Sequence, residues 1–189
     1  MKKLFKITAM TFATFCIVLF VAFLVCNIKP IDIKAKADEL KAYCARNGYD
    51  TDYAILVDLG RFSLQRRMFV YDFRQDKIVI RSLAGHGSGG GSTVLRADFS
   101  NVHGSHCSSL GHYKVGRNRM MYNHPSVPAF ELIGLDKTNS NAHERGILIH
   151  PSAGPLSLGC VTLPFCRYYQ LSELLMSRPG NVIMWVYEK

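Results

Sequence analysis

Two short segments carry a histidine and a cysteine in a pattern that predicts acyl-transfer chemistry. An apolar run at 147–149 precedes His150, and Gly159-Cys160 follows ten residues later. A thiol is a useful nucleophile as its thiolate, and a nearby imidazole can take the proton. Glycine before the cysteine lets the backbone approach a substrate carbonyl closely and supplies N–H groups for an oxyanion. We therefore expect Cys160, His150 and Gly159 to form a cysteine acyl-transfer site.

The same residues also have a structural interpretation. Free cysteine is among the most often buried residue types, and a histidine at a strand end can serve packing alone. The intervening residues 151–156 contain two prolines and a glycine, so they form a loop that allows the chain to fold back. Ser157 and Thr162 place small polar groups around Cys160, which is unlike a core strand. These surroundings favour the chemical interpretation.

The first residues of the chain differ in kind from the rest. An uncharged run over 7–28 follows three lysines and is 22 residues long. That length matches the ~20 residues of a transmembrane helix and exceeds the ~7–15 of a signal-peptide core. We expect 1–28 to be a membrane anchor or signal sequence, 29–37 a linker, and 38–189 a domain outside the cytoplasm. Ala35-Lys36-Ala37 keeps cleavage and secretion open as the alternative.

Charge and cysteine usage limit the function classes. The net charge is +9, of which residues 1–37 contribute +5 and the remaining residues +4. That domain has no Lys/Arg run interleaved with aromatics, so we expect no nucleic-acid partner. Its four cysteines are Cys44, Cys107, Cys160 and Cys166. If Cys160 stays free, at most one disulfide forms inside the domain, and Cys44–Cys107 and Cys107–Cys166 both remain open.

The predicted elements are mainly strands. Runs rich in Val, Ile, Phe and Tyr predict strands at 53–59, 62–73, 77–83, 146–150 and 182–187. Good helix formers, with acids first, a base last and Gly48 as a stop, predict a short helix at 38–46. Leucines at helical spacing predict another at 168–177. We read the first three strands as an antiparallel meander. The expected fold class is mainly β with a few short helices, a sandwich or barrel preceded by one N-terminal transmembrane helix.

Two segments between these elements have unusual composition. Residues 85–92 are rich in glycine but lack the Gly-Lys-Ser/Thr ending of a phosphate loop, so they predict a flexible wall or a mobile linker. Histidines then gather at His103, His106 and His112, near Cys107. Imidazole and thiolate are natural zinc ligands, which keeps a zinc-dependent cell-wall peptidase open. The chain has no His-Glu-x-x-His motif to support it.

Four patches in order resemble the murein L,D-transpeptidase catalytic domain family, also called YkuD-type enzymes. They are Ala84–Gly89, the Phe-Ser-Asn…Gly-Ser…Ser-Ser-Leu-Gly-x-Tyr block at Phe99–Tyr113, Asn139–His150 and Ser157–Cys160. The combination is specific, and it extends over roughly residues 50 to 188. The resemblance implies an L,D-transpeptidase-like fold for the exported domain.

The resemblance also assigns roles to residues. Cys160 matches the nucleophile and His150 its base. Gly159 lies in the turn that forms the oxyanion hole, and Ser157 supports that turn. The better-known branch has a histidine where Leu158 stands and an arginine where Thr162 stands.

The implied function is a peptidoglycan L,D-transpeptidase of the bacterial cell envelope that needs no cofactor or metal. Its partners would be peptidoglycan stem peptides, with the membrane holding the N-terminal segment. A thioester forms with release of D-alanine, and an amine or water resolves it; with water the activity is L,D-carboxypeptidase. We expect His86, Ser108 and Tyr113 to contact substrate, although His86 can equally be solvent-exposed and Tyr113 part of the core. A non-catalytic peptidoglycan-binding domain remains the other alternative.

Overall fold

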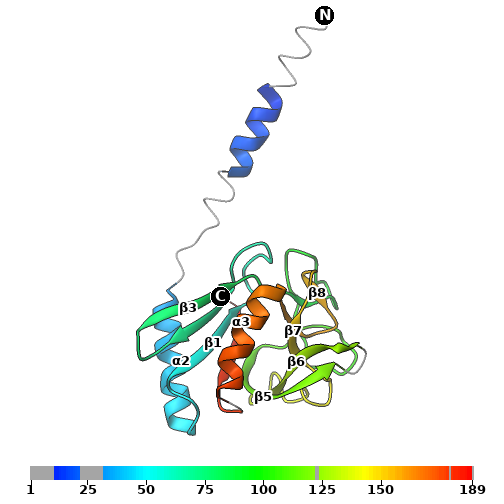
Figure 1. Ribbon diagram of the computed structural model, residues 1–189. Coiled ribbons are helices and arrows are strands. Elements are labelled where there is room, and N and C mark those ends of the chain that lie inside the picture. Colours follow the sequence, from blue (N-terminus) through cyan, green and yellow to red (C-terminus); the bar gives the residue numbers. More distant parts are fainter. Residues whose placement is uncertain (1–10, 22–31, 122–123, 179, 189) are drawn as a thin grey trace, which may run out of the picture. The chain divides into compact units, whose positions relative to one another are not determined.

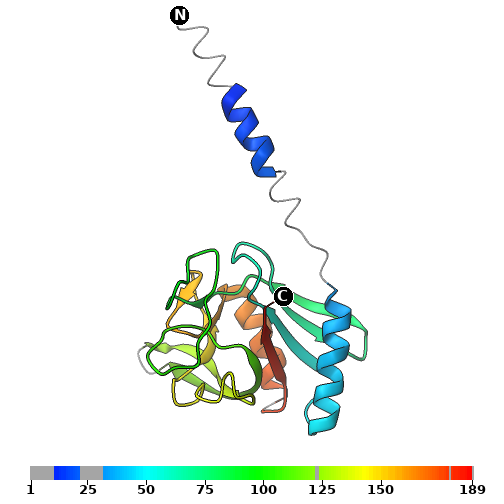
Figure 2. The same cartoon turned by 180° about the vertical axis from the view of Figure 1, so that it is seen from behind.

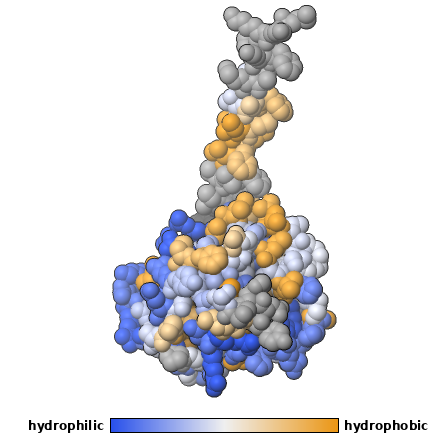
Figure 3. Space-filling model, turned by 45° about the vertical axis from the view of Figure 1, so that its right-hand side comes forward, coloured by the Kyte–Doolittle hydropathy of each residue, from blue (hydrophilic) through white to orange (hydrophobic). Residues whose placement is uncertain are grey.

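The computed structural model describes residues 11–21, 32–121, 124–178 and 180–188. The chain divides into two compact units, residues 1–33 and 34–189, and we call the second the main unit. The first unit contains a helix over residues 11–21, and its apolar side chains are exposed (Figure 3). Within the described ranges, no helix is long and apolar enough to cross a membrane. The predicted transmembrane helix and membrane attachment are therefore not supported, and residues 7–10 and 22–28 of that prediction lie outside the described residues.

An eight-stranded sheet forms the framework of the main unit (Figure 1). Its order is β3-β2-β1-β10-β5-β6-β7-β9, while β4 and β8 form a separate pair. The strands are β1 (Tyr53–Asp58), β2 (Met68–Asp72), β3 (Lys77–Ser82), β4 (His86–Gly87), β5 (Gly111–Met121), β6 (His124–Gly134), β7 (Leu148–Pro151), β8 (Leu156–Ser157), β9 (Val161–Leu163) and β10 (Ile183–Tyr187).

The predicted meander is confirmed. Strands β1, β2 and β3 pair antiparallel in sequence order, and every residue of β2 is buried. Strand β2 begins at Met68, six residues later than the sequence predicts, because residues 62–67 turn toward the loops. The fully buried Arg67 lies in this turn and donates to the carbonyls of Ala84 and Arg61. Arg67 thus lies directly before the first residue of β2.

Strand β10 joins the two halves of the sheet. It pairs parallel with β1 on one side and antiparallel with β5 on the other. Four of its five residues are buried, which fits the continuous apolar pattern of a strand covered on both faces. The prediction of a closing strand here is confirmed, and its central position in the sheet is what the sequence did not indicate.

A long hairpin, β5 and β6, was missed by the sequence reasoning. Both strands run for 11 residues and pair antiparallel. Arginine, asparagine and proline interrupt the apolar alternation between 116 and 128, so the period-2 signal is weak there. The pairing shifts register between Val115 and Asn118, which is a β-bulge in β5.

Strand β7 follows β6 in the sheet and pairs parallel with β9. This pairing sets Ile149 opposite Val161 and His150 opposite Thr162. Since Cys160 directly precedes β9, the segment that bears His150 and the segment that bears Cys160 lie side by side in the sheet.

Two helices cover the sheet (Figures 1 and 2). Helix α2 (Ile33–Asn47) buries Ala37, Leu40 and Cys44, which share one face at helical spacing. It begins at Ile33, within the segment predicted as a linker. Helix α3 (Phe165–Met176) buries Tyr168, Leu171 and Leu175. Both predicted helices are present, each with a longer N-terminal part than expected.

The glycine-rich segment is tightly packed instead of forming a loose wall. A Cβ at Gly87 would lie 2.2 Å from the His106 carbonyl oxygen, and one at Gly89 would lie 1.8 Å from that of Ser105. Real Cβ atoms do not approach that closely, so these positions require glycine. Strand β4, within this segment, pairs parallel with β8. The segment thereby joins the loop over 99–109 to the residues that precede Cys160.

Candidate active site

The turn before Cys160 depends on glycine. Gly159 has φ +117°, a conformation that L side chains rarely adopt. A Cβ there would lie 2.8 Å from the Ile147 Cδ1 atom and 3.0 Å from the Cys107 carbonyl oxygen. Both the backbone angle and the close contacts exclude a side chain, so Gly159 fixes the direction in which Cys160 leaves the turn.

Ser157 braces this turn with its hydroxyl. It donates to the carbonyl of Cys160 over 2.7 Å and accepts the N–H of Gly159 over 3.2 Å. Ser108 holds the same turn from the other side, since its hydroxyl donates to the Gly159 carbonyl over 3.2 Å. That hydroxyl also accepts the Gly87 N–H over 2.9 Å. The turn is therefore held by two serines that lie far apart in the sequence.

The sulfur of Cys160 lies in a mostly apolar cluster. Its residue is 9% exposed and packs with Ala129 and Leu148, with Met121 against them. The Leu148 N–H donates to Sγ over 3.3 Å, and the thiol contacts the Gly146 carbonyl at 3.9 Å. Burial raises the pKa of Cys160, while the Leu148 N–H and the charge of Arg145 act in the opposite direction. The resting group is accordingly a thiol that needs a base.

His150 lies on the strand next to Cys160 and on the same face of the sheet. Leu148 and His150 are two residues apart in β7, so their side chains share a face, and Cys160 packs against Leu148 on that face. The register sets His150 opposite Thr162, two residues beyond Cys160. Sheet geometry then separates the Cα atoms of His150 and Cys160 by about 8 Å, within reach of converging side chains.

A backbone carbonyl orients the His150 ring. Nδ1 lies 2.9 Å from the carbonyl oxygen of Pro151. Because a carbonyl only accepts, Nδ1 carries the proton in this contact, and Nε2 is the unprotonated nitrogen of the neutral ring. Sequence reasoning did not find this orienting group, because a main-chain oxygen leaves no signal in residue type.

Arg145 clamps the loop over 99–109 beside the cysteine turn. Its guanidinium donates to the carbonyls of Ser100 and Cys107, at 3.0 and 2.6 Å, and to the hydroxyl of Ser109 at 2.6 Å. The same group lies 3.2 Å from the position of a Cβ on Gly159. Arg145 lies within the matched patch Asn139–His150, but its residue type does not indicate these contacts. Its position next to the turn is visible only in the fold.

His86 is fully buried and does not line an open cleft. Nδ1 lies 2.7 Å from the Arg67 guanidinium, and Nε2 lies 3.0 and 3.1 Å from the carbonyls of Thr93 and Arg96. Burial lowers the pKa of His86, and the charge of Arg67 lowers it further. A neutral ring with the proton on Nε2 satisfies all of these contacts. Through these hydrogen bonds, His86 holds the loop over 93–96 in place.

The other two expected substrate contacts are also buried. Ser108 is 1% exposed and braces the cysteine turn. Tyr113 is 2% exposed, and its hydroxyl donates to the Ser109 carbonyl over 2.7 Å. Burial raises the pKa of Tyr113 well above its usual range. The core position weighed for Tyr113 matches this placement.

The histidines proposed as zinc ligands do not come together. The ring of His112 stacks on Tyr43 at 4.0 Å and on Trp185 at 5.0 Å, and its Nδ1 lies 2.9 Å from an Asp136 oxygen. His103 and His106 lie on the loop instead. No group of three or more His, Cys, Asp or Glu residues suited to a metal occurs in the described part of the chain. The basis for the zinc peptidase alternative is therefore lost.

The disulfides weighed from the sequence are not formed. Cys44, Cys107, Cys160 and Cys166 are all free thiols. Cys44 is fully buried in helix α2, and burial raises its pKa to about 11. Among the described cysteines of the main unit, Cys160 is therefore not engaged in a disulfide.

Several solved structures are similar to this chain. The solved structure of Pgp2 from Campylobacter jejuni, described as a helical cell shape determining protein, matches with TM-score 0.51 and 16% identity over 79% of this chain and 55% of that one. Bd1075 of Bdellovibrio bacteriovorus matches with TM-score 0.46 and 17% identity over 75% and 49%. An L,D-transpeptidase from Xylanimonas cellulosilytica matches with TM-score 0.42 and 12% identity over 77% and 68%.

The likeness to Pgp2 shows a shared fold, and the chain spans about half the length of the Pgp2 and Bd1075 chains. A comparison with curated proteins gives no match. The model of the L,D-transpeptidase catalytic domain family, however, matches residues 27–176. This range contains both strands of the Cys160 and His150 site as well as the loop that Arg145 clamps. The chain belongs to the L,D-transpeptidase catalytic domain family.

Proposed function

We propose that this protein modifies peptidoglycan in the cell envelope as an L,D-transpeptidase, with Cys160 as nucleophile and His150 as general base. The observation that carries the proposal is the placement of both side chains on one face of adjacent strands, next to a turn that only glycine can form. Family membership supports the peptidoglycan substrate. The roles of the individual residues rest on this geometry.

The reaction begins when His150 Nε2 takes the thiol proton of Cys160. The sulfur attacks the carbonyl carbon of the L-centre at the third position of a stem peptide, and the carbonyl oxygen becomes an oxyanion. The C–N bond to D-alanine breaks as the imidazolium returns its proton to the departing amine. A thioester remains on Cys160. An amine of a second stem, or water, attacks it and restores the thiol.

The orientation of His150 suits both proton transfers. The Pro151 carbonyl holds the proton on Nδ1 and stabilises the ring when Nε2 is also protonated. Because burial raises the pKa of Cys160, a thiolate is scarce at neutral pH without this base. Transfer of the thiol proton from Cys160 to His150 therefore accompanies attack on the substrate.

The turn supplies the oxyanion donors. The two donors are the backbone N–H groups of Gly159 and Cys160. In the structure, the Gly159 N–H donates to the Ser157 hydroxyl. We infer that substrate binding shifts this hydroxyl toward the Cys160 carbonyl, which it already contacts, so that the Gly159 N–H can turn to the oxyanion. In well-studied acyl-transfer enzymes, one such donor contributes about 2.7–4 kcal/mol to transition-state stabilisation.

Intact-mass analysis tests the assignment. The full chain is mixed with a defined tetrapeptide stem, and we expect an adduct equal to the stem minus D-alanine. Cys160→Ala should carry no adduct, whereas Cys166→Ala, which removes an exposed thiol elsewhere, should still form it. An adduct on the Cys160→Ala protein would overturn the proposal. Stem binding without any adduct on the unaltered chain would point to the non-catalytic peptidoglycan-binding alternative.

A further inference from the structure

The outer half of β5 has a neighbouring strand on one side only. Its pairing with β10 covers Gly111–Lys114, and the Val115 N–H adds one contact to the Val182 carbonyl. Beyond this point β5 continues to Met121 and stays paired with β6. Among the described residues, no backbone hydrogen bond joins residues 116–121 to a strand other than β6. These residues therefore form a free strand edge about 20 Å long.

The other edge of the same hairpin is interrupted by its sequence. In β6, Pro125 and Pro128 lack the backbone N–H that a hydrogen-bond ladder requires. Residues 116–121 contain no proline, so the β5 edge keeps all its donors. The side chains of Arg117–Met120 are exposed. Of the two edges, that of β5 is the one suited to accept a further strand.

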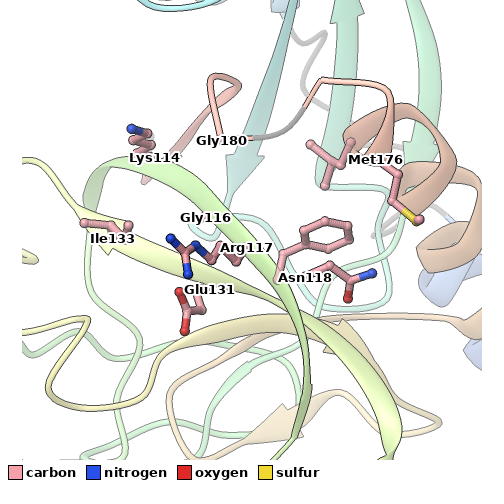
Figure 4. A pocket seen from close by; sticks show the side chains of 10 residues that line it. Lys114, Gly116, Arg117, Asn118, Glu131, Ile133, Met176 and Gly180 are labelled. Atoms are coloured by element: carbon pink, nitrogen blue, oxygen red, sulfur yellow. The ribbon is translucent and has the colours of Figure 1, made fainter.

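A cavity lies beside this edge. Its volume is about 450 Å³. Residues 116–118 line it from β5, and Met176 and Gly180 line it from the end of α3 and the turn that follows. Figure 4 shows Met176 and Gly180 on one side of β5 and Glu131 of β6 on the other. Because β10 flanks the preceding residues of β5, the cavity lies where a further strand would continue the sheet.

The charges along the edge favour an acidic ligand. Three basic side chains, those of Lys114, Arg117 and Arg119, lie along β5, and the acid Glu131 faces them from β6. The Glu131 carboxylate pairs with the Arg119 guanidinium at 3.0 Å. Neither Lys114 nor Arg117 forms an ion pair with a described residue. Two cations beside the free edge are therefore open to carboxylates of a ligand.

The opposite face of the edge offers apolar contact. Asn118 stands opposite Phe130, whose ring lies toward α3. Met120, two residues further along the strand, shares this face. Met120 and Met176 are 56% and 62% exposed, and methionine side chains adapt to apolar partners of different shape. An added strand with acidic and apolar residues in alternation would match both faces.

We propose that the β5 edge over 116–121 binds an extended, acidic segment of a partner protein as an added strand. The backbone of this segment continues the hydrogen-bond ladder of β5. Its carboxylates pair with Lys114 and Arg117, and an apolar side chain between them fills the cavity beside Met176. A second copy of this edge does not suit the site, because like charges would then face each other.

This inference goes beyond the proposed function, since it concerns neither the stem peptide nor the reaction at Cys160. Strands β6 and β7 separate β5 from β9, so the edge lies about 14 Å from the cysteine strand across the sheet. The edge thus recruits a partner beside the candidate active site.

The alternative is a protected edge. Basic side chains on an edge strand also serve to keep other strands away. In that role Arg117 and Arg119 prevent pairing with any peptide, whatever its charge. The cavity and the exposed methionines have no part in such protection, whereas they contribute directly to binding. A protected edge binds no extended peptide, which separates the two interpretations.

Binding of a designed peptide to the full-length chain tests the inference. The probe is a short peptide with blocked ends in which glutamate alternates with valine and leucine. One control peptide has lysine in place of glutamate, and another is the glutamate peptide with N-methylated backbone amides. We expect the probe to bind at least about ten-fold more tightly than either control. Bound probe should also protect the amides of 116–121 from hydrogen exchange.

Two charge reversals locate the site. Arg117→Glu should weaken the glutamate peptide at least about ten-fold and remove its advantage over the lysine peptide. Arg81→Glu is the matched control, because it makes the same change at an exposed residue of β3, an edge strand at the far end of the sheet. This control should leave binding unchanged. Hydrogen exchange of the β1 amides checks that both variants are folded.

Three outcomes would overturn the inference. Failure of every peptide to bind would show a protected edge. An equal loss in Arg81→Glu and Arg117→Glu would show that the peptide responds to overall charge or adds to β3. Displacement of the probe by a tetrapeptide stem would assign the edge to the substrate and not to a partner protein.

Discussion

The backbone N–H of Leu148 points at the sulfur of Cys160 from 3.3 Å, across the parallel pairing of β7 with β9. This contact ties the strand that bears His150 to the turn that bears the thiol. It favours the thiolate, yet burial acts more strongly and raises the pKa of Cys160. The site therefore contains a reactive group that its own surroundings keep protonated, which makes the role of the base measurable.

Replacing His150 with alanine should slow thioester formation by about 10²–10⁴-fold, the usual contribution of a positioned acid–base group. In this variant the raised pKa of Cys160 keeps the neutral thiol dominant at pH 7. The rate of its alkylation by iodoacetamide should therefore increase at a higher pH than the rate for an ordinary thiol. Peptide mapping across pH measures this, with the exposed Cys166 as internal control. Faster alkylation of Cys160 than of Cys166 at pH 6 would contradict it.

Gly159→Ala should abolish activity and lower stability. The added Cβ meets Ile147 and the Cys107 carbonyl at 3.0 Å or less, and the positive φ adds strain of about 1–2 kcal/mol. Gly154→Ala is the matched control, because a Cβ there has nothing within 4 Å and its φ lies outside the left-handed region. Thermal unfolding and the thioester assay compare the two. Unchanged activity in Gly159→Ala would show that the turn does not set the geometry of Cys160.

Arg145→Met should release the loop over 99–109 from the cysteine turn. Its charge-assisted hydrogen bonds contribute about 1.5–3 kcal/mol each when buried, and partial exposure reduces this, so we expect a loss of about 3 kcal/mol in the free energy of unfolding. The alkylation pKa of Cys160 should also rise, since the Arg145 charge lowers it. Arg145→Lys keeps the charge, so it should preserve that pKa while still losing stability. Denaturant unfolding and alkylation profiles separate the two effects.

The buried His86 should make folding sensitive to acid. Its pKa in the folded state lies below the unfolded value of about 6.5, because burial and Arg67 disfavour the charged ring. The stabilising contribution is complete above pH 6.5 and is lost as the pH falls through the lower folded pKa. Denaturant unfolding at pH 7.5 and 5.5 should show a larger drop for the unaltered chain than for His86→Gln. An equal drop in both would place the acid sensitivity elsewhere.

The sequence predicted the parts of the fold that have strong local patterns. The strands at 53–59 and 77–83 were found from their runs of β-branched and aromatic residues. The helix at 38–46 was found from its helix formers and the glycine after it, and the helix at 168–177 from the spacing of its leucines. The β5–β6 hairpin was missed because arginine, asparagine and proline between 116 and 128 interrupt the apolar alternation. Polar residues within a long strand obscure the pattern from which secondary structure is inferred.

The candidate site was likewise predicted only in part from the sequence. Residue type and order predicted the neighbouring placement of His150 and Cys160. The Pro151 carbonyl and the burial of His86 could not be predicted, because both depend on how distant segments meet. The glycines of 85–92 indicated mobility by composition, whereas Gly85, Gly87 and Gly89 approach other backbone atoms too closely for any side chain. Composition alone does not separate these two uses of glycine.

The place of β10 in the sheet has a consequence for biosynthesis. Within the eight-stranded sheet, β10 is the strand that lies between β1 and β5, so the hydrogen-bond ladder from β1–β3 to the strands beside Cys160 runs through residues 183–187. While a ribosome is still translating earlier codons, neither half can complete its hydrogen-bond ladder at this seam. The nascent polypeptide therefore acquires a finished fold, and with it an assembled thiol centre, only after this late segment has emerged.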